Sequence, residues 1–288
     1  MTKITMLNSM AGRDFADSLD QHRAWGLTHL DLKDSIWGKS LIDLTDDEAK
    51  RATELIRERE LTTYCFSTVL FHSNIESGEA EFRANHLGAV DRIITLAKIM
   101  QPRIIRLLGA ATEKRKELTD TIPYIKSNHP WLIPMYGEAI DRISDAGFPV
   151  TIENETGNCI FGYPHEILAF FDELGRREKV SFTWDVQNLW EVGTFPSIEV
   201  YHQLKDLIGY YHIKGGQHDG TSTKLCWQST LEDASWPVLE ITKQVIADGV
   251  SPVICLNPSH GKPKEGYDYS NVTKRNLDFL RREIPEVE

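Results

Sequence analysis

Four apolar segments in the second half of the sequence each contain one polar residue that could take part in chemistry. They are Glu153, Asp185, His212 and Asn257, which offer two carboxylates, an imidazole and an amide oxygen. This donor set suits a hard or borderline divalent cation such as Mn²⁺, Mg²⁺, Co²⁺ or Zn²⁺. Because carboxylates buried without a partner are strongly destabilising, one shared metal ion is the simplest explanation for all four.

Each of these residues also has an ordinary structural interpretation when it is taken alone. An Asp or Glu at the end of a strand often caps the next helix, and a lone His in an apolar segment more often packs and hydrogen-bonds than binds a metal. The metal hypothesis therefore depends on the four residues lying together, which in turn depends on the elements that carry them.

Short apolar runs alternate with longer amphipathic segments along the whole chain. This alternation predicts an α/β protein built of eight βα units, and the apolar character of the strands favours a closed parallel (β/α)₈ barrel. A doubly wound open sheet would need a glycine-rich turn after its first strand, where this chain has no GxGxxG motif. The predicted strands are 3–9, 28–34, 62–69, 103–110, 149–155, 180–186, 209–215 and 252–258, and the clearest helices are 46–60, 82–100, 165–178 and 235–249.

The predicted barrel has consequences for domain organisation and for the position of the site. Since no linker or change in composition divides the chain, residues 1–288 are expected to form a single domain. Functional sites of such barrels lie at the carboxyl ends of the strands. The candidate residues of strands five to eight should therefore converge on one mouth.

Composition excludes several kinds of partner. The chain has 288 residues with 32 Lys+Arg against 43 Asp+Glu, a formal net charge of −11. This balance disfavours nucleic acid and anionic membrane surfaces. No apolar stretch is long enough for a transmembrane span, and the first ten residues lack the pattern of a signal peptide. The four cysteines form no CxxC pair, so reduced thiols and a cytoplasmic location are expected.

The strand-end residues resemble the xylose isomerase-like TIM barrel superfamily, which includes sugar phosphate isomerases and epimerases. The resemblance implies one divalent metal bound by Glu153, Asp185 and His212, with Asn257 at the position of the fourth ligand. Two departures stand out: Asn257 replaces the usual Glu, and Asn188 lies where a His commonly follows the Asp by three residues. The resemblance also implies a small carbohydrate or sugar-acid substrate, favours Mn²⁺ among the possible metals, and leaves self-association into a homo-oligomer open.

The absence of a carboxylate at the position of the fourth ligand narrows the reactions that are expected. A two-base epimerase is disfavoured, because Asn257 cannot take a proton and Glu153 is then the one obvious base. One base suffices for an isomerase that acts on a polyhydroxylated keto or aldehyde substrate through a metal-stabilised enediolate. A metal-dependent lyase that decarboxylates a 3-oxo sugar acid is the alternative. A non-catalytic sugar-binding or partner subunit is the further possibility.

Four more residues are candidates for substrate binding. Lys214 follows His212 by two positions and should face the same side of its strand, while Asn188 follows Asp185. His72 and His260 lie in predicted loops over the mouth of the barrel.

Overall fold

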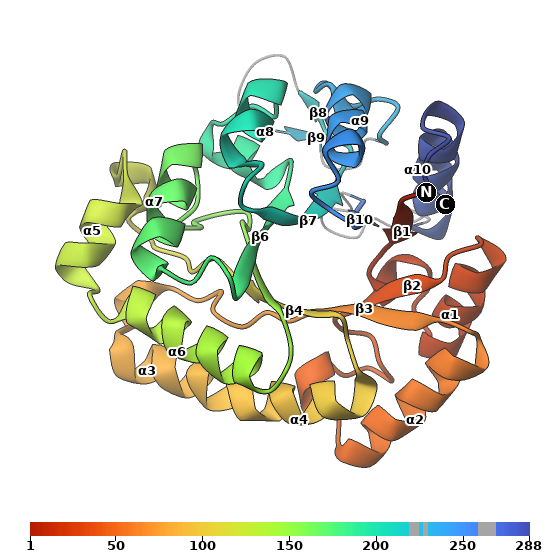
Figure 1. The fold of residues 1–288 in the computed structure, drawn as a ribbon, viewed down its shortest axis with the longest axis horizontal. Coiled ribbons are helices and arrows are strands. Elements are labelled where there is room, and N and C mark those ends of the chain that lie inside the picture. The colour runs from red at the N-terminus through yellow and green to blue at the C-terminus, as the bar shows by residue number, and fades with distance from the viewer. Residues whose placement is uncertain (219–224, 227–229, 259–268) are drawn as a thin grey trace.

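The computed structural model describes residues 1–218, 225–226, 230–258 and 269–288. Eight parallel strands form one sheet in the order β1-β10-β7-β6-β5-β4-β3-β2. Figure 1 shows helices surrounding this sheet on the outside, with the two chain termini side by side next to β1. The strands are β1 (Lys3–Thr5), β2 (His29–Leu32), β3 (Thr62–Ser67), β4 (Ile104–Leu108), β5 (Val150–Glu153), β6 (Val180–Asp185), β7 (Ile208–Ile213) and β10 (Val253–Leu256).

Contact between the first and second strands brings the ends of the sheet together. The amide of Asp31 donates to the carbonyl of Met6 at 2.8 Å, and Leu7 forms a parallel bridge with Asp31. On its other side β1 pairs with β10 in parallel. The predicted fold class, a single (β/α)₈ barrel, is thereby confirmed, and each of the eight predicted strands overlaps an observed one.

Amphipathic helices cover the outside of the barrel, and their ends follow local chemistry. Thr45 and Glu48 form a capping box at the start of α2, which satisfies backbone amides that have no partner within the helix. Gly175 and Gly249 end α7 and α9 in the left-handed conformation. The α-helices are α1 (Phe15–Ala24), α2 (Asp46–Glu58), α3 (Glu79–Asn85), α4 (Val90–Met100), α5 (Thr121–Asn128), α6 (Leu132–Asp145), α7 (Pro164–Leu174), α8 (Ile198–Leu204), α9 (Val238–Asp248) and α10 (Tyr269–Glu283).

The helix predicted over 82–100 is broken in the structure. A short 3₁₀ turn, Leu87–Ala89, separates α3 from α4. His86 stands at the break, and its Nδ1 accepts a hydrogen bond from the backbone amide of Phe71 at 3.0 Å. This contact with a segment distant in sequence could not be seen in the helical periodicity.

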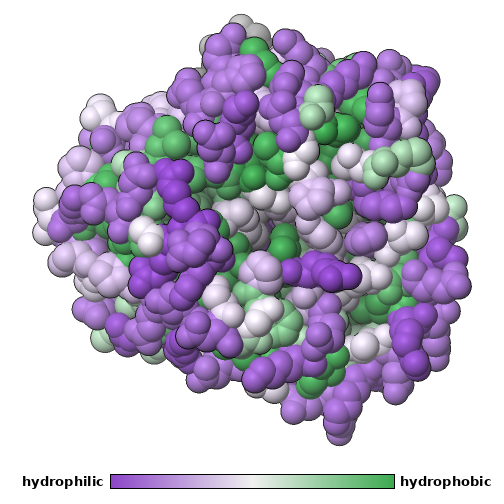
Figure 2. Space-filling view, in the orientation of Figure 1, coloured by the Kyte–Doolittle hydropathy of each residue, from purple (hydrophilic) through white to green (hydrophobic). Residues whose placement is uncertain are grey.

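The segments that follow β7 and β10, which the sequence predicts as the long loops 216–234 and 259–271, lie partly outside the described residues. The loop 216–234 contains the two-residue strands β8 (Gln217–His218) and β9 (Leu225–Cys226), which pair antiparallel. Of the loop 259–271, only its last residues fall within the described ranges. On the face of the molecule seen in Figure 2, hydrophilic residues predominate around the rim, and apolar residues lie nearer the centre.

No helix within the described ranges combines the length and the apolar character that a membrane crossing requires.

Candidate metal centre

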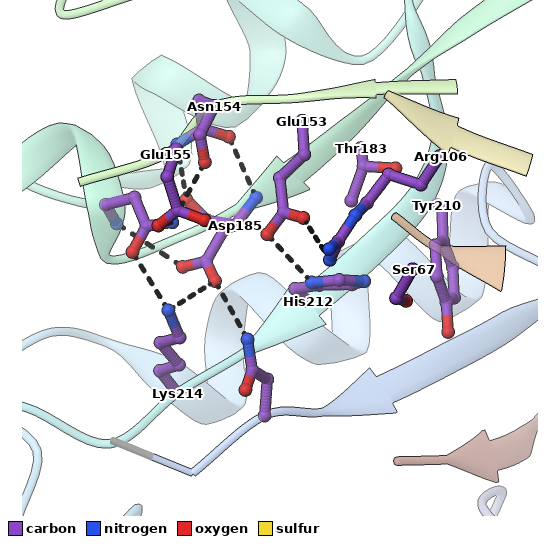
Figure 3. A network of polar contacts seen from close by, with 12 residues as sticks. Ser67, Arg106, Glu153, Asn154, Glu155, Thr183, Asp185, Tyr210, His212 and Lys214 are labelled. Carbon is purple, nitrogen blue, oxygen red and sulfur yellow. Dashed lines mark hydrogen bonds and ion pairs between the residues drawn. The ribbon is translucent and has the colours of Figure 1, made fainter. Parts of the chain in front are cut away.

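The four residues proposed from the sequence as metal ligands lie together and are buried. Glu153 and Asp185 are the last residues of β5 and β6, and His212 lies in β7 directly opposite Asp185. Asn257 follows β10, and its backbone amide donates to the carbonyl of Ile213 at 2.9 Å. Neighbouring parallel strands thus bring all four side chains to the same region of the barrel (Figure 3).

Three of the four form a compact ligand group. Glu153, Asp185 and His212 each offer an atom within 4.8 Å of the others. Nδ1 of His212 lies 3.0 Å from Oε1 of Glu153, and two ligands that are each about 2.1 Å from one ion and at right angles are about 3 Å apart. Nδ1 is thus the imidazole atom that faces this group, while Nε2 of His212 lies on the other side of the ring, buried and without a hydrogen-bond partner among the described residues. The donor set therefore fits a divalent cation.

Arg106 is part of this centre, although the sequence analysis did not select it. Its guanidinium lies 2.5 Å from Oε2 of Glu153 and donates to the carbonyl of Thr68 at 3.1 Å. Both partners of the ion pair are almost fully buried. The available signal was an arginine inside the otherwise apolar run of β4.

Burial and charge act in opposite directions on Glu153. Burial raises the pKa of this carboxyl, but the charges of Arg106 and His212 outweigh it and hold the pKa well below its ordinary value. Glu153 is therefore ionised at neutral pH, and it is a weaker base than an isolated glutamate.

Lys214 and Asn257 both approach Asp185. Nζ of Lys214 lies 2.7 Å from Oδ2 of Asp185, and Nδ2 of Asn257 donates to the same oxygen at 3.3 Å. Burial is the larger influence on Asp185 and raises its pKa, against the opposing effect of Lys214. The pKa of Lys214 is itself raised, because the charge of Asp185, together with other carboxylates, outweighs the effect of burial.

Asn188 connects this lysine to the end of β5. Its Oδ1 accepts from Nζ of Lys214 at 2.9 Å, and its Nδ2 donates to the carbonyl of Asn154 at 2.9 Å. Asn154 in turn exchanges two hydrogen bonds of 2.9 Å with the backbone of Asp185. The network holds the ends of β5 and β6 together and fixes the direction of the Asp185 side chain.

Of the two histidines that the sequence places in loops, His72 is described by the structure and His260 is not. His72 is half-buried, and its Nδ1 lies 3.0 Å from the carbonyl of Gly109, so it connects the segments that follow β3 and β4. Within the described residues, its hydrogen bonds go to the carbonyls of Gly109 and Val69 and do not reach the metal-ligand group. His260 lies outside the described residues.

A second polar cluster lies beside His212. Asp31 accepts hydrogen bonds from Tyr210 at 2.7 Å, Thr5 at 3.1 Å and Ser67 at 3.4 Å, and burial raises its pKa. Asp31, His212 and Cys255 also bring potential ligand atoms within 4.8 Å of one another. The three hydroxyl donors to Asp31 explain why this carboxyl is tolerated in the barrel.

A third group of potential metal ligands, among the residues that the structure describes, has a structural role instead. Asp120, His165 and Glu166 approach one another, but Glu166 is fully engaged with the protein. It accepts from Arg115 at 2.7 Å and from the backbone amides of Thr121, Gly162 and Tyr163. These bonds secure the start of α7 and leave no reason to invoke an ion.

A small cavity adjoins the centre through Arg106. It has a volume of about 110 Å³, and its lining includes Ser67 at the end of β3 and, just after β2 and β3, Lys33 and Thr68. The carbonyl of Thr68 accepts a hydrogen bond from Arg106, and the same guanidinium forms the ion pair with Glu153. Arg106 therefore connects the wall of this cavity to the metal-ligand group.

Solved structures share this architecture at low sequence identity. A xylose isomerase-like TIM barrel protein from Mycobacterium smegmatis in complex with magnesium is 17% identical, with a TM-score of 0.68, covering 98% of this chain and 95% of that one. A 3-keto-D-glucoside 4-epimerase from E. coli is 13% identical, with a TM-score of 0.72 over 98% and 100% of the two chains. The probable 3-DHS dehydratase AsbF from Bacillus anthracis is 14% identical, with a TM-score of 0.72 over 96% and 98%.

At these identities the structural similarity establishes the fold alone. A search of curated proteins found no match to the sequence. The family model described as xylose isomerase-like TIM barrel matches residues 19–275. The resemblance inferred from the strand-end residues is therefore confirmed, and the chain belongs to the xylose isomerase-like TIM barrel family.

Proposed function

We propose that the protein is a divalent-metal-dependent isomerase of a small polyhydroxylated keto or aldehyde substrate. One observation carries the proposal: Glu153, Asp185 and His212 offer buried ligand atoms within 4.8 Å of one another at the ends of adjacent strands. A divalent ion held there would polarise a carbonyl and its neighbouring hydroxyl, and so lower the cost of forming an enediolate. Membership of the family and a structurally similar protein in complex with magnesium support the binding of a divalent metal.

In this proposal Glu153 is the group that moves the proton. It removes a proton from the carbon next to the carbonyl and returns it on the same face to the former carbonyl carbon, so that a second base at carbon is not needed. The proton of the neighbouring hydroxyl passes to the former carbonyl oxygen, which becomes the new hydroxyl. The amide of Asn257 cannot take up a proton as a base, which is why isomerisation is favoured over two-base epimerisation. Arg106 orients the Glu153 carboxylate by binding its other oxygen.

One observation favours a second candidate, a metal-dependent lyase that decarboxylates a 3-oxo sugar acid. Burial raises the pKa of Glu153, but the ion pair with Arg106 outweighs it and holds the pKa below its ordinary value. Glu153 is a weaker base as a result. Loss of CO₂ leaves an enolate that needs an acid rather than a base. The structure of the centre is compatible with either reaction.

The remaining assignments follow from the donor set and its surroundings. Mn²⁺ is the metal that we favour for two carboxylates and an imidazole, with Mg²⁺, Co²⁺ and Zn²⁺ as alternatives. Asn257 would complete the set through its amide oxygen. Lys214 and Asn188 are proposed to contact substrate, and His72 and His260 to approach it from the loops. The buried free thiols of Cys65, Cys159 and Cys255 support a cytoplasmic location.

Metal content and one substitution test the proposal. Purified protein should contain one divalent ion per chain, and Glu153→Gln should lose it, whereas Glu155→Gln, which removes the same charge two residues further on, should keep it.

Incubation of the metal-loaded enzyme with ketoses and keto acids then separates the reactions. Uptake of solvent deuterium without CO₂ supports the isomerase, and CO₂ release supports the lyase. A chain without metal, unaffected by chelators, would be a non-catalytic sugar-binding or partner subunit.

A further inference from the structure

All the acceptor positions of the Asp185 carboxylate are already used by the protein. Oδ1 accepts from the backbone amides of Gln187 at 3.2 Å and Asn188 at 3.3 Å. Oδ2 accepts from Nζ of Lys214 at 2.7 Å and from Nδ2 of Asn257 at 3.3 Å (Figure 3). A carboxylate offers about four lone-pair positions. A metal ion can therefore reach Asp185 only by displacing one of these donors.

Two of the four donors can leave. Asn257 can turn its side-chain amide so that the oxygen faces the ion, and Lys214 can swing away. The backbone amides of Gln187 and Asn188 lie at the start of the 3₁₀ turn Asn188–Val192, and they cannot turn away without unwinding it. Lys214 has a flexible side chain, and its positive charge would be repelled by an ion bound to the same oxygen. Displacement of the ammonium is thus favoured both by charge and by freedom of movement.

A position for the displaced ammonium already exists. Nζ of Lys214 lies 2.9 Å from Oδ1 of Asn188, and Nδ2 of Asn188 is anchored on the carbonyl of Asn154 at 2.9 Å. The side chain can move off Asp185 while it keeps this hydrogen bond. It would then be a buried cation in direct contact with a neutral amide, whose Nδ2 lies 3.4 Å from Oε1 of Glu155, and an incoming anion would supply the counter-charge that Asp185 no longer gives.

Arg106 does not behave in the same way. Its guanidinium is held by Thr68 as well as by Glu153, and it occupies Oε2 while Oε1 faces His212. Metal binding at Oε1 leaves this ion pair in place. The two buried cations of the centre therefore have different roles, one permanent and one exchangeable.

We propose that Lys214 is an exchangeable counter-ion, which neutralises Asp185 in the metal-free protein and, once a divalent ion takes its place, binds the carboxylate of an acidic substrate. The inference rests on the proposed metal centre and deepens it. It assigns the substrate to the sugar acids or keto acids and gives Lys214 two successive partners. Order of binding follows from it, since the substrate site is completed only after the metal has bound.

Metal affinity measured without substrate tests the exchange. Isothermal titration with Mn²⁺ is compared for the wild type, Lys214→Met and Lys33→Met, the last of which removes a lysine from the neighbouring cavity. We expect Lys214→Met to bind Mn²⁺ at least tenfold more tightly than the wild type, and Lys33→Met to match the wild type. Lys214→Gln, which retains a hydrogen-bonding side chain, gives the same comparison if the methionine variant does not fold. Equal or weaker binding by both variants would overturn the exchange.

A second titration tests the substrate class. D-glucuronate and D-glucose are titrated into the Mn²⁺-loaded proteins. The wild type should bind glucuronate at least tenfold more tightly than glucose, and Lys214→Met should lose this preference. A preference that persists in the variant, or is missing from the wild type, overturns the carboxylate assignment. If neither wild type nor Lys214 variants bind Mn²⁺, the proposed function itself fails, an outcome distinct from failure of the exchange alone.

Discussion

The guanidinium of Arg106 lies 2.5 Å from Oε2 of Glu153, and both side chains are buried. The pair joins β4 to β5, but the residue directly opposite Glu153 is Leu108 and the one opposite Arg106 is Thr151. The ion pair therefore runs diagonally across the two strands. It is a permanent feature of the centre, and it can be tested without knowing the substrate.

Removing both members of this pair should cost less stability than the sum of the two single removals. Arg106→Met and Glu153→Leu each leave an uncompensated buried charge, which we expect to lower the free energy of unfolding by about 3–5 kcal/mol. The double variant should lose clearly less than the sum. Chemical denaturation of the metal-free proteins measures these differences. Arg83→Met removes an exposed pair with Glu138 and serves as control, with an expected loss below about 1 kcal/mol. Additive losses at Arg106 and Glu153 would contradict the interpretation.

Asn257→Glu should lower the stability of the metal-free protein and raise its affinity for the metal. The new carboxylate would replace an amide that now donates to Asp185 at 3.3 Å, so the metal-free variant should be less stable by about 1–3 kcal/mol. With a third carboxylate available at the position of the fourth ligand, Mn²⁺ affinity should rise by about tenfold or more.

Titration with Mn²⁺ and thermal melts with and without the ion measure both effects. Asn257→Gln keeps the amide and is the matched control, for which affinity should stay near that of the wild type. If the Glu variant binds Mn²⁺ no better than the Gln variant, residue 257 lies outside the ligand sphere.

Gly216→Ala should disturb the loop that follows β7. A Cβ at this position would lie 1.5 Å from Nε2 of Gln187, which now donates to the carbonyl of Gly215 at 2.8 Å. Because Gln187 is buried, we expect a loss of about 1–3 kcal/mol in the free energy of unfolding. Gly12→Ala is the control, since its nearest neighbours would be 3.5 Å away. A Gly216 variant as stable as this control would show that Gln187 can move freely.

Acid should remove a stabilising contribution from Asp141, on the outside of the barrel. Hydrogen bonds from Arg176 and then Lys179 hold the pKa of Asp141 at about 2, below its ordinary value of 3.8. Because the folded-state pKa is the lower one, the carboxylate stabilises the protein above about pH 4, and this effect disappears as the pH falls toward 2.

We expect Asp141→Asn to cost about 1 kcal/mol at pH 7, a figure reduced for solvent screening, and less as the pH approaches 3. Urea denaturation at several pH values provides the measurement. Asp145→Asn is the control, because this exposed carboxylate lies 3.9 Å from Lys179. A difference between Asp141→Asn and the wild type that did not shrink in acid would argue against the ion pair as its source.

The parts of the site that could be predicted are those that depend on single strands. Glu153, Asp185 and His212 were recognisable because each interrupts an apolar run, and the order of elements indicated that parallel strands would carry them to one end of a barrel. Arg106 interrupts β4 in the same way, but it stands two residues before the end of its strand. Its importance depends on the register between β4 and β5, which the sequence pattern does not specify.

The sequence by itself determined the barrel and the residue types at its mouth, because hydrophobic periodicity and strand-end polarity are local properties of the chain. The tertiary structure alone decided how these residues are paired: Arg106 with Glu153, Lys214 with Asp185, and Asn188 between Lys214 and Asn154. The physical reason is that a buried charge is stabilised by whichever partner the register of adjacent strands and the direction of the side chains bring within about 3 Å. Those two quantities are set by packing between segments far apart in the chain.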